Sequence, residues 1–165
     1  MDEAKEKSRG TVFVEKLLKQ CADDTRLSAA MRRAVNPALE PQCWPWLVRF
    51  GVNVESASER AAFVCVGAAL IKGHVAANGS VPFGRALAKS YEADSPQAEA
   101  RLRRLLACDS VQGCTQVLRA LIPLVQSRCQ ATVDYAALLD DLLRFRGYPD
   151  RVRAKWTMQF FGADK

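Results

Sequence analysis

Apolar residues along this chain recur at helical spacing over most of its length. Val14, Leu17 and Cys21 lie three or four residues apart and share one face of a helix. A second helix over 27–35 ends where Pro37 forbids its continuation. Alternating patterns typical of strands are nearly absent. We therefore predict an all-α fold, a compact helical bundle of about seven to nine helices.

The segment 61–71 is apolar on every side, a pattern typical of a central, fully buried helix. Ser56 and Glu59 form a capping box before it, in which each side chain accepts a hydrogen bond from a free amide. Gly79 follows Asn78 and can adopt the left-handed conformation of a helix stop, so we expect the helix to end there. The apolar run itself is too short to span a membrane.

The rest of the chain divides into further helices and short connections. Two tryptophans and two prolines in 41–50 predict an aromatic connection that packs on the core. Helical periodicity returns in five later segments, namely 83–91, 96–107, 111–128, 134–146 and 151–161.

Length favours one folding unit, because 165 residues support one full hydrophobic core and rarely two. Residues 1–10 are polar, and we expect them to form a flexible N-terminus. A single all-α domain is expected over 11–163, with a division into two lobes near 92–96 as an open alternative. The charged start of the chain lacks a signal-peptide pattern, so we expect a cytoplasmic protein with reduced thiols.

The charge balance is basic, with 24 Lys and Arg against 18 Asp and Glu. After residue 82, ten of the thirteen cations are arginines, whose planar fork suits bidentate contact with phosphate. Five cations and one acid fall within 144–155 alone. Such a surface, one basic face of the bundle, attracts a polyanion. An ordinary solvated face remains the alternative, because basic helical faces are common.

A helical wheel separates the cations of the last helix from its apolar stripe. Val152, Trp156 and Phe160 form the stripe, which leaves the cations on its two flanks exposed. Arg151 and Lys155 lie on one flank and Arg153 lies on the other. We expect these cations to form one edge of a groove that contacts nucleic-acid backbone rather than bases.

An enzyme or a metal protein is not indicated. The six cysteines include no Cys-x-x-Cys pair, and a lone His74 is expected to be a core or capping residue. Asp140 and Asp141 are adjacent, but a helix turns them about 100° apart and both are expected on its outer face. Asp140 is then free to pair with Arg144 on the surface. We therefore predict no catalytic residue, no metal and no cofactor.

Several short segments resemble a known family in their order and spacing. They are Met31-Arg32-Arg33-Ala34, Phe83-Gly84-Arg85-Ala86, Leu105-Leu106-Ala107-Cys108-Asp109, Val117-Leu118-Arg119, Val133-Asp134-Tyr135 and Val152-Arg153-Ala154-Lys155-Trp156. Together they resemble the CasB family, the small subunit of type I-E CRISPR Cascade surveillance complexes, over 14–162. One departure is Ser110, which stands where the family has an arginine.

The resemblance implies an all-α, non-catalytic subunit of a crRNA-guided antiviral complex. Such a subunit contacts crRNA, the other Cascade subunits and its own second copy, and has no membrane role. It stabilises the R-loop by holding the backbones of the target and displaced non-target DNA strands. The resemblance and the cationic faces together give twelve candidate nucleic-acid-binding residues: Arg32, Arg33, Arg85, Lys89, Arg101, Arg104, Arg119, Arg144, Arg146, Arg151, Arg153 and Lys155.

Two other classes of function stay open at this point. A helical protein-interaction adaptor would use the basic face to meet acidic partners and would have no direct role with nucleic acid. A helix-turn-helix regulator would need a recognition helix, and no turn with the required spacing is clear in the sequence.

Overall fold

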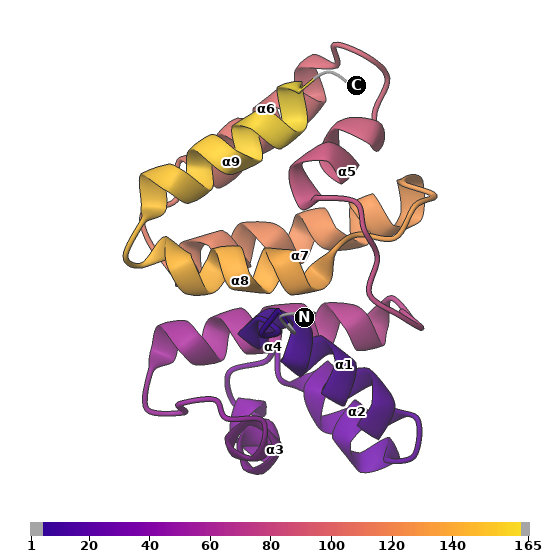
Figure 1. Ribbon diagram of the computed structural model, residues 1–165, viewed down its shortest axis with the longest axis vertical. Coiled ribbons are helices and arrows are strands. Elements are labelled where there is room, and N and C mark those ends of the chain that lie inside the picture. The colour runs from indigo at the N-terminus through magenta and orange to yellow at the C-terminus, as the bar shows by residue number, and fades with distance from the viewer. Residues whose placement is uncertain (1–4, 163–165) are drawn as a thin grey trace.

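The structure, a computed structural model, describes residues 5–162 (Figure 1). These residues form nine α-helices, one 3-10 helix and no strand beyond an isolated bridge between Val81 and Val133. The all-α prediction is confirmed. The helices are α1 (Arg9–Cys21), α2 (Thr25–Arg33), η1 (Glu40–Cys43), α3 (Trp44–Arg49), α4 (Ala57–Lys72), α5 (Phe83–Lys89), α6 (Pro96–Leu106), α7 (Val111–Arg128), α8 (Tyr135–Phe145) and α9 (Pro149–Phe161).

The first helix begins earlier than expected. α1 starts at Arg9, where the Ser8 side chain accepts a hydrogen bond from the amide of Thr11 and caps the helix. Residues 1–4, part of the expected flexible N-terminus, lie outside the described residues, as does residue 163, the expected end of the domain.

Helix α4 is the centre of the molecule, as its apolar pattern predicts. It packs on α7 and α8 on one side and on α2 and α1 on the other (Figure 1). Residues 62–68 are all buried. Gly67 faces α2, where a Cβ atom would meet the terminal methyl group of Met31 and that flexible side chain would have to shift.

The start of α4 differs in detail from the expected capping box. The Ser56 hydroxyl accepts from the amide of Glu59 at 3.2 Å, as predicted. The Glu59 carboxylate does not reach back to Ser56; it accepts from the amide of Asn53 at 2.8 Å and pairs with Arg9. Glu59 therefore joins the start of α4 to α1, a contact that local sequence does not reveal.

Helix α4 ends at Lys72, so the prediction of a stop at Asn78 and Gly79 was wrong. His74 takes the left-handed position with φ 50°, and its amide donates to the carbonyl of Ile71. The amide of Val75 donates to Leu70, which completes a Schellman motif. Of the two roles expected for His74, the structure therefore bears out the capping role, whereas its exposed side chain excludes a core role. Histidine adopts this conformation far less often than glycine, so the sequence favoured Gly79 over His74 as the end of the helix.

The segment 41–50 is helical rather than an open connection. Pro41 and Pro45 occupy the first turns of η1 and α3, where the missing amide of proline leaves no hydrogen bond unmade. The expectation that the tryptophans pack on the core is confirmed, since Trp44 and Trp46 are partly buried against it.

Helices α5, α6 and α9 lie on the other side of α7 and α8 from α1–α3 (Figure 1). Helix α9 packs on both α5 and α8. A Cβ atom at Gly84 of α5 would lie 2.6 Å from the carbonyl oxygen of Trp156, so only glycine allows this crossing. The amide of Gly84 also donates to Gln159 at 3.1 Å. These contacts fix α9 against α5 and α8 and leave its opposite face exposed to solvent.

Candidate nucleic-acid interface

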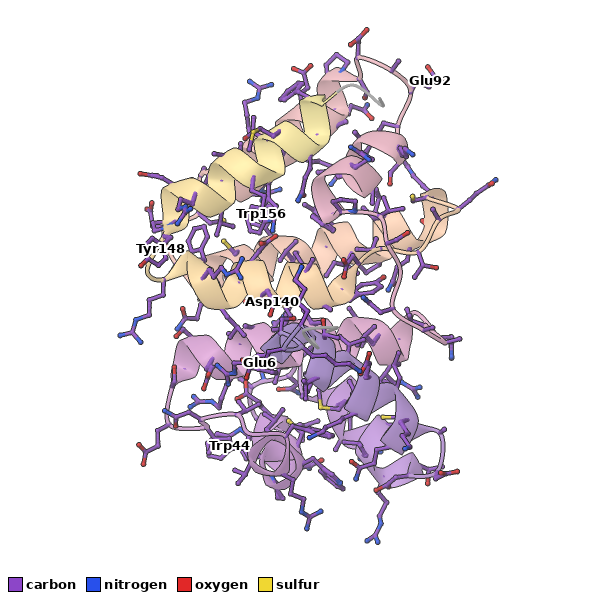
Figure 2. The ribbon with its side chains drawn as sticks, in the orientation of Figure 1. Glu6, Trp44, Glu92, Asp140, Tyr148 and Trp156 are labelled. Carbon is purple, nitrogen blue, oxygen red and sulfur yellow. The ribbon has the colours of Figure 1, made fainter. Side chains whose placement is uncertain are left out.

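Helix α9 is anchored by a tryptophan whose indole has a polar partner inside the core. Trp156 is fully buried and its ring stacks on Phe145 with the centroids 6.2 Å apart. Its Nε1 donates to Oδ2 of Asp141 at 3.1 Å. Figure 2 shows Trp156 between α8 and α9, away from solvent. Asp141 is only 3% exposed, so its expected place on the outer face was wrong.

The buried carboxylate of Asp141 also binds a predicted site residue. Lys155 Nζ lies 2.8 Å from Oδ1 of Asp141 and neutralises it. Burial raises the pKa of Asp141 above its ordinary value, while Lys155, Trp156 and Arg144 act in the opposite direction. Lys155 therefore positions α9 and is only partly available to a ligand. The neighbouring Asp140 accepts a hydrogen bond from the amide of Gly10 and so joins α8 to α1.

Arg153 is a structural residue as well, although the wheel placed it on an exposed flank. Its side chain is 26% exposed and donates to the carbonyl of Cys108 at 2.7 Å. It pairs with Asp150 at 2.9 Å and more loosely with Asp109 at 3.7 Å. Its guanidinium also lies over the ring of Phe145. Arg153 therefore holds α9 to the loop that precedes α7.

A groove of about 550 Å³ runs along the outer side of α8 and α9. It is lined by Arg144, Tyr148, Arg151, Val152, Lys155 and Met158. We call it the α8–α9 groove. It brings three predicted cations together, and none of its lining residues is acidic. Arg144 and Arg151 are exposed to solvent.

A second, smaller groove of about 210 Å³ lies between α6 and α7. Two predicted cations, Arg101 and Arg104, line it together with residues of α7. Leu102 and Leu105 of the same helix are buried, as the wheel predicts, and Arg104 is exposed. We call it the α6–α7 groove.

The other predicted cations lie apart from these grooves. Arg32 and Arg33 are exposed on α2, at the opposite end of the molecule from α9 (Figure 1). Arg119 is exposed on α7, and Lys89 is exposed at the end of α5. Arg85, also on α5, is partly buried and engaged in contacts within the protein.

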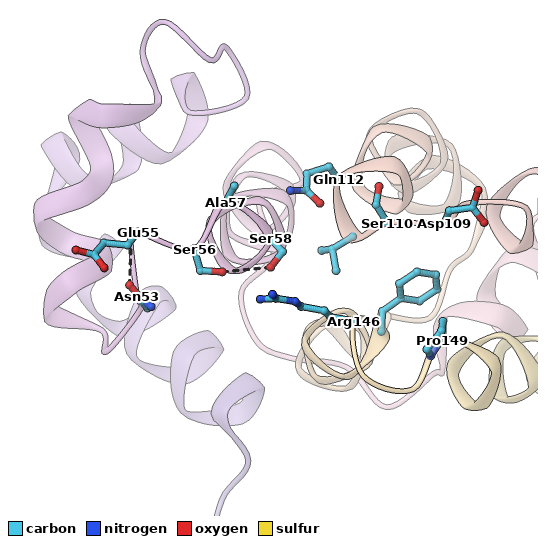
Figure 3. A pocket seen from close by; sticks show the side chains of 12 residues that line it. Asn53, Glu55, Ser56, Ala57, Ser58, Asp109, Ser110, Gln112, Arg146 and Pro149 are labelled. Atoms are coloured by element: carbon cyan, nitrogen blue, oxygen red, sulfur yellow. Dashed lines mark hydrogen bonds between the residues drawn. The ribbon is translucent and has the colours of Figure 1, made fainter.

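Arg146 lies in a third cleft, of about 570 Å³, where α4, α7 and α9 begin. Figure 3 shows its side chain extending towards Ser56 and Ser58 at the start of α4. The hydroxyls of Ser56 and Ser110 are engaged as helix caps, since each accepts from a backbone amide of its own helix. Ser110 thus has a structural role in starting α7, at the position where an arginine was expected from the family pattern. Asp109 and Glu55 at the edge of this cleft oppose anion binding.

Groups that could perform catalysis are poorly placed. Burial raises the pKa of Cys43 to about 11 and those of Cys65 and Cys114 to about 12, so these thiols stay protonated near neutral pH. Among residues 5–162, no group of three or more His, Cys, Asp or Glu side chains could hold a metal ion. The helices of this part also include none that is long and apolar enough to cross a membrane.

Sequence reasoning missed three large apolar side chains on the surface. Tyr148, Met158 and Phe161 are 60%, 67% and 58% exposed. Tyr148 stands between Arg146 and Arg151 in the cation-rich stretch, and this aromatic position among cations was the available signal. Met158 and Phe161 lie outside the apolar stripe of the helix, and their exposure was not predicted from the sequence.

The described residues therefore define a class of protein, a small all-α protein with cation-lined grooves on its outer helices. The family model of CRISPR-associated protein Cse2 matches residues 28–161. The chain belongs to this Cse2 family. A Cse2 protein of Thermus thermophilus is 31% identical over 144 residues, which cover 84% of this chain and 80% of the relative.

Solved structures agree with the family assignment. The crystal structure of CasB from Thermus thermophilus has a TM-score of 0.71 and 27% identity, and the match covers 95% of this chain and all of that one. A chain from a CRISPR RNA-guided surveillance complex has a TM-score of 0.69 and 22% identity, over 92% of this chain and 90% of that one. The second likeness concerns the fold alone. The resemblance to the CasB family is confirmed.

Proposed function

We propose that this protein is a non-catalytic small subunit of a cytoplasmic CRISPR Cascade complex. In this proposal the subunit binds nucleic-acid backbone and stabilises the R-loop. The observation that carries the proposal is the α8–α9 groove, whose lining has three cations and no carboxylate, in a chain of the Cse2 family. The match to the family model of CRISPR-associated protein Cse2 supports a place in such an assembly.

The cations that line the grooves fit a subunit that binds nucleic-acid backbone without reading its sequence. In an RNA-guided complex, base pairing with the guide reads the target sequence, so a subunit beside the strands need supply only charge and shape. Arginines suit that role because their planar guanidinium contacts phosphate oxygens in pairs. The proposed partners are crRNA, the target and non-target DNA strands, neighbouring subunits and a second copy of this chain.

The environments of the cations refine which residues the proposal uses. Arg104, Arg119 and Arg33 are exposed and make the best candidates for backbone contacts outside the α8–α9 groove. Arg153 and Lys155 are neutralised by Asp150 and Asp141, so their first role in the proposal is to position α9.

The test replaces Arg104, Arg144 and Arg151 with alanine together and assembles the variant with the other Cascade subunits and crRNA. We expect normal assembly by native mass and a shorter R-loop lifetime. We also expect the salt dependence of single-strand binding to fall by a slope of about 2, since each lost phosphate contact removes about 0.7.

A matched control removes three exposed lysines outside the candidate set, Lys16, Lys19 and Lys72. It lowers the net charge by the same amount and should leave R-loop lifetime unchanged. Equal lifetimes for the arginine variant, the lysine variant and the original protein would refute the backbone-binding role. Failure of the original protein to enter the complex would refute the assignment as a subunit.

The protein-interaction adaptor remains the second candidate, favoured by the exposed apolar side chains of Met158 and Phe161. An adaptor would bind acidic protein partners and would retard no nucleic acid in a gel shift at low salt. Retardation that disappears as salt is raised would exclude the pure adaptor.

A further inference from the structure

Two of the exposed apolar side chains share one concave surface. Tyr148 and Met158 both line the α8–α9 groove, whereas Phe161 lies outside it. Single apolar side chains on a surface need no explanation, but two of them inside a groove with three cations indicate a ligand that is both apolar and anionic.

The Tyr148 ring is held in place without being buried. The Tyr148 amide donates to the carbonyl of Arg144 at 2.9 Å, and Pro149 fixes the backbone on its other side. The guanidinium of Arg151 lies 5.8 Å from the ring centroid. This cation–π contact restrains the ring and still leaves the side chain 60% exposed. Figure 2 shows Tyr148 at the outer edge of the molecule, where α8 turns into α9.

We propose that the α8–α9 groove binds a single-stranded nucleic-acid segment, with one base stacked on Tyr148 and its phosphates beside Arg144 and Arg151. The inference rests on the proposed function and adds a contact with a base to the contacts with backbone. A cation-lined groove with an aromatic platform is the arrangement by which proteins bind single strands without sequence preference. Double-stranded nucleic acid does not fit, because its bases already stack on one another and hide their faces.

The groove also favours nucleic acid over an acidic protein segment. Its volume of about 550 Å³ falls within the range of about 300–1,000 Å³ that is typical of small-molecule sites, which suits a base and its sugar. The Tyr148 side chain makes no capping hydrogen bond to α9, so the start of that helix does not depend on it. An exposed aromatic face beside arginines matches a nucleobase better than an aliphatic side chain.

The test compares a 20-mer of deoxythymidine with an abasic 20-mer of equal length and charge. The full-length protein should bind the thymidine oligomer about five- to tenfold more tightly, as expected for one stacked base. Tyr148→Ala should remove this difference and leave the affinity for the abasic strand unchanged. Tyr148→Phe should keep the difference, because stacking does not need the hydroxyl. Phe161 is an exposed aromatic residue at the end of α9 and lies outside the groove, so Phe161→Ala should also keep the difference in affinity.

The outcomes separate this inference from the proposed function. Equal affinity of the original protein for both oligomers would overturn base stacking and leave backbone binding standing. Absence of binding to either oligomer would overturn both. A Tyr148→Ala variant that keeps the thymidine preference and loses self-association or subunit binding would assign the groove to a protein and overturn the inference. Circular dichroism and urea unfolding of each variant establish that it is folded.

Discussion

The ion pair between Lys155 and Asp141 leads to a prediction about which partner matters more for stability. Lys155 is 43% exposed, whereas the Asp141 carboxylate is buried in the core. Lys155→Ala would leave that carboxylate charged, with the indole of Trp156 still donating to it. Asp141→Asn would instead remove the buried charge and leave a lysine that water can solvate.

The expected magnitudes differ between the two variants. Removing one partner of a buried ion pair costs about 3–5 kcal/mol, but the exposure of Lys155 lets water reach this pair, so we expect about 2 kcal/mol. For a chain of this size that corresponds to a fall in melting temperature of about 4–8 °C. Asp141→Asn should cost less, about 1 kcal/mol or below, since its amide oxygen can still accept from Trp156.

The pH dependence gives the prediction a sign. Burial raises the pKa of Asp141, so the folded protein holds this proton more tightly than the unfolded chain does. The stabilisation by this proton is complete at a pH below the pKa of Asp141 in the unfolded chain. It is lost as the pH rises through the pKa of Asp141 in the folded protein. Loss of the Lys155 cation raises the pKa further. The difference in unfolding free energy between the original protein and Lys155→Ala should therefore become smaller as the pH is lowered through the pKa of Asp141 in the folded state.

Urea unfolding followed by tryptophan fluorescence measures these free energies at each pH. The double variant Lys155→Ala with Asp141→Asn serves as the control, because it has no buried charge and should show no such narrowing. The reasoning is refuted if Asp141→Asn costs more than Lys155→Ala at neutral pH, or if the gap widens as the solution is acidified.

Two further predictions concern single residues with unexpected environments. Arg153→Ala should lower the free energy of unfolding by about 1–3 kcal/mol, because it removes the hydrogen bonds to Cys108 and Asp150. Urea unfolding measures this change, and an unchanged free energy would show that α9 does not need Arg153 as an anchor. His74→Gly should raise the melting temperature by a few degrees, because a backbone φ of 50° costs histidine about 1 kcal/mol that glycine avoids. Calorimetry measures the melting temperature, and a lower value for the variant would contradict this explanation.

Most of the fold could be predicted because it depends on local patterns. The ranges expected for α6 and α7, 96–107 and 111–128, agree with the helices Pro96–Leu106 and Val111–Arg128, whose starts are capped by the hydroxyls of Ser95 and Ser110. The central place of α4 follows from its apolar faces. The end of α4 could not be predicted, because the residue that turns the chain is His74 and not a glycine. Helix stops at unusual residues depend on tertiary contacts that pattern does not contain.

The candidate site was harder to predict because ion pairs join distant parts of the chain. The wheel correctly placed Val152 and Trp156 in the core. It could not reveal that Arg153 binds the carbonyl of Cys108, 45 residues earlier. A wheel also assigns a charged residue to the outer face by default, which is how Asp141 was misplaced. Periodicity tells which side of a helix is apolar, whereas the partner of each charge depends on the packing of whole helices.

These pairs change how the basic surface should be understood. A cation attracts a phosphate most strongly when no carboxylate already neutralises it, so Arg153 and Lys155 add less to nucleic-acid binding than their charge implies. Arg144 and Arg151, which share a groove lined by no acidic residue, add more. A loss of binding on replacing Arg153 or Lys155 would therefore first reflect the displacement of α9 and the groove it carries. Assignment of backbone contacts should rest on the exposed arginines, with unfolding free energies measured beside each affinity.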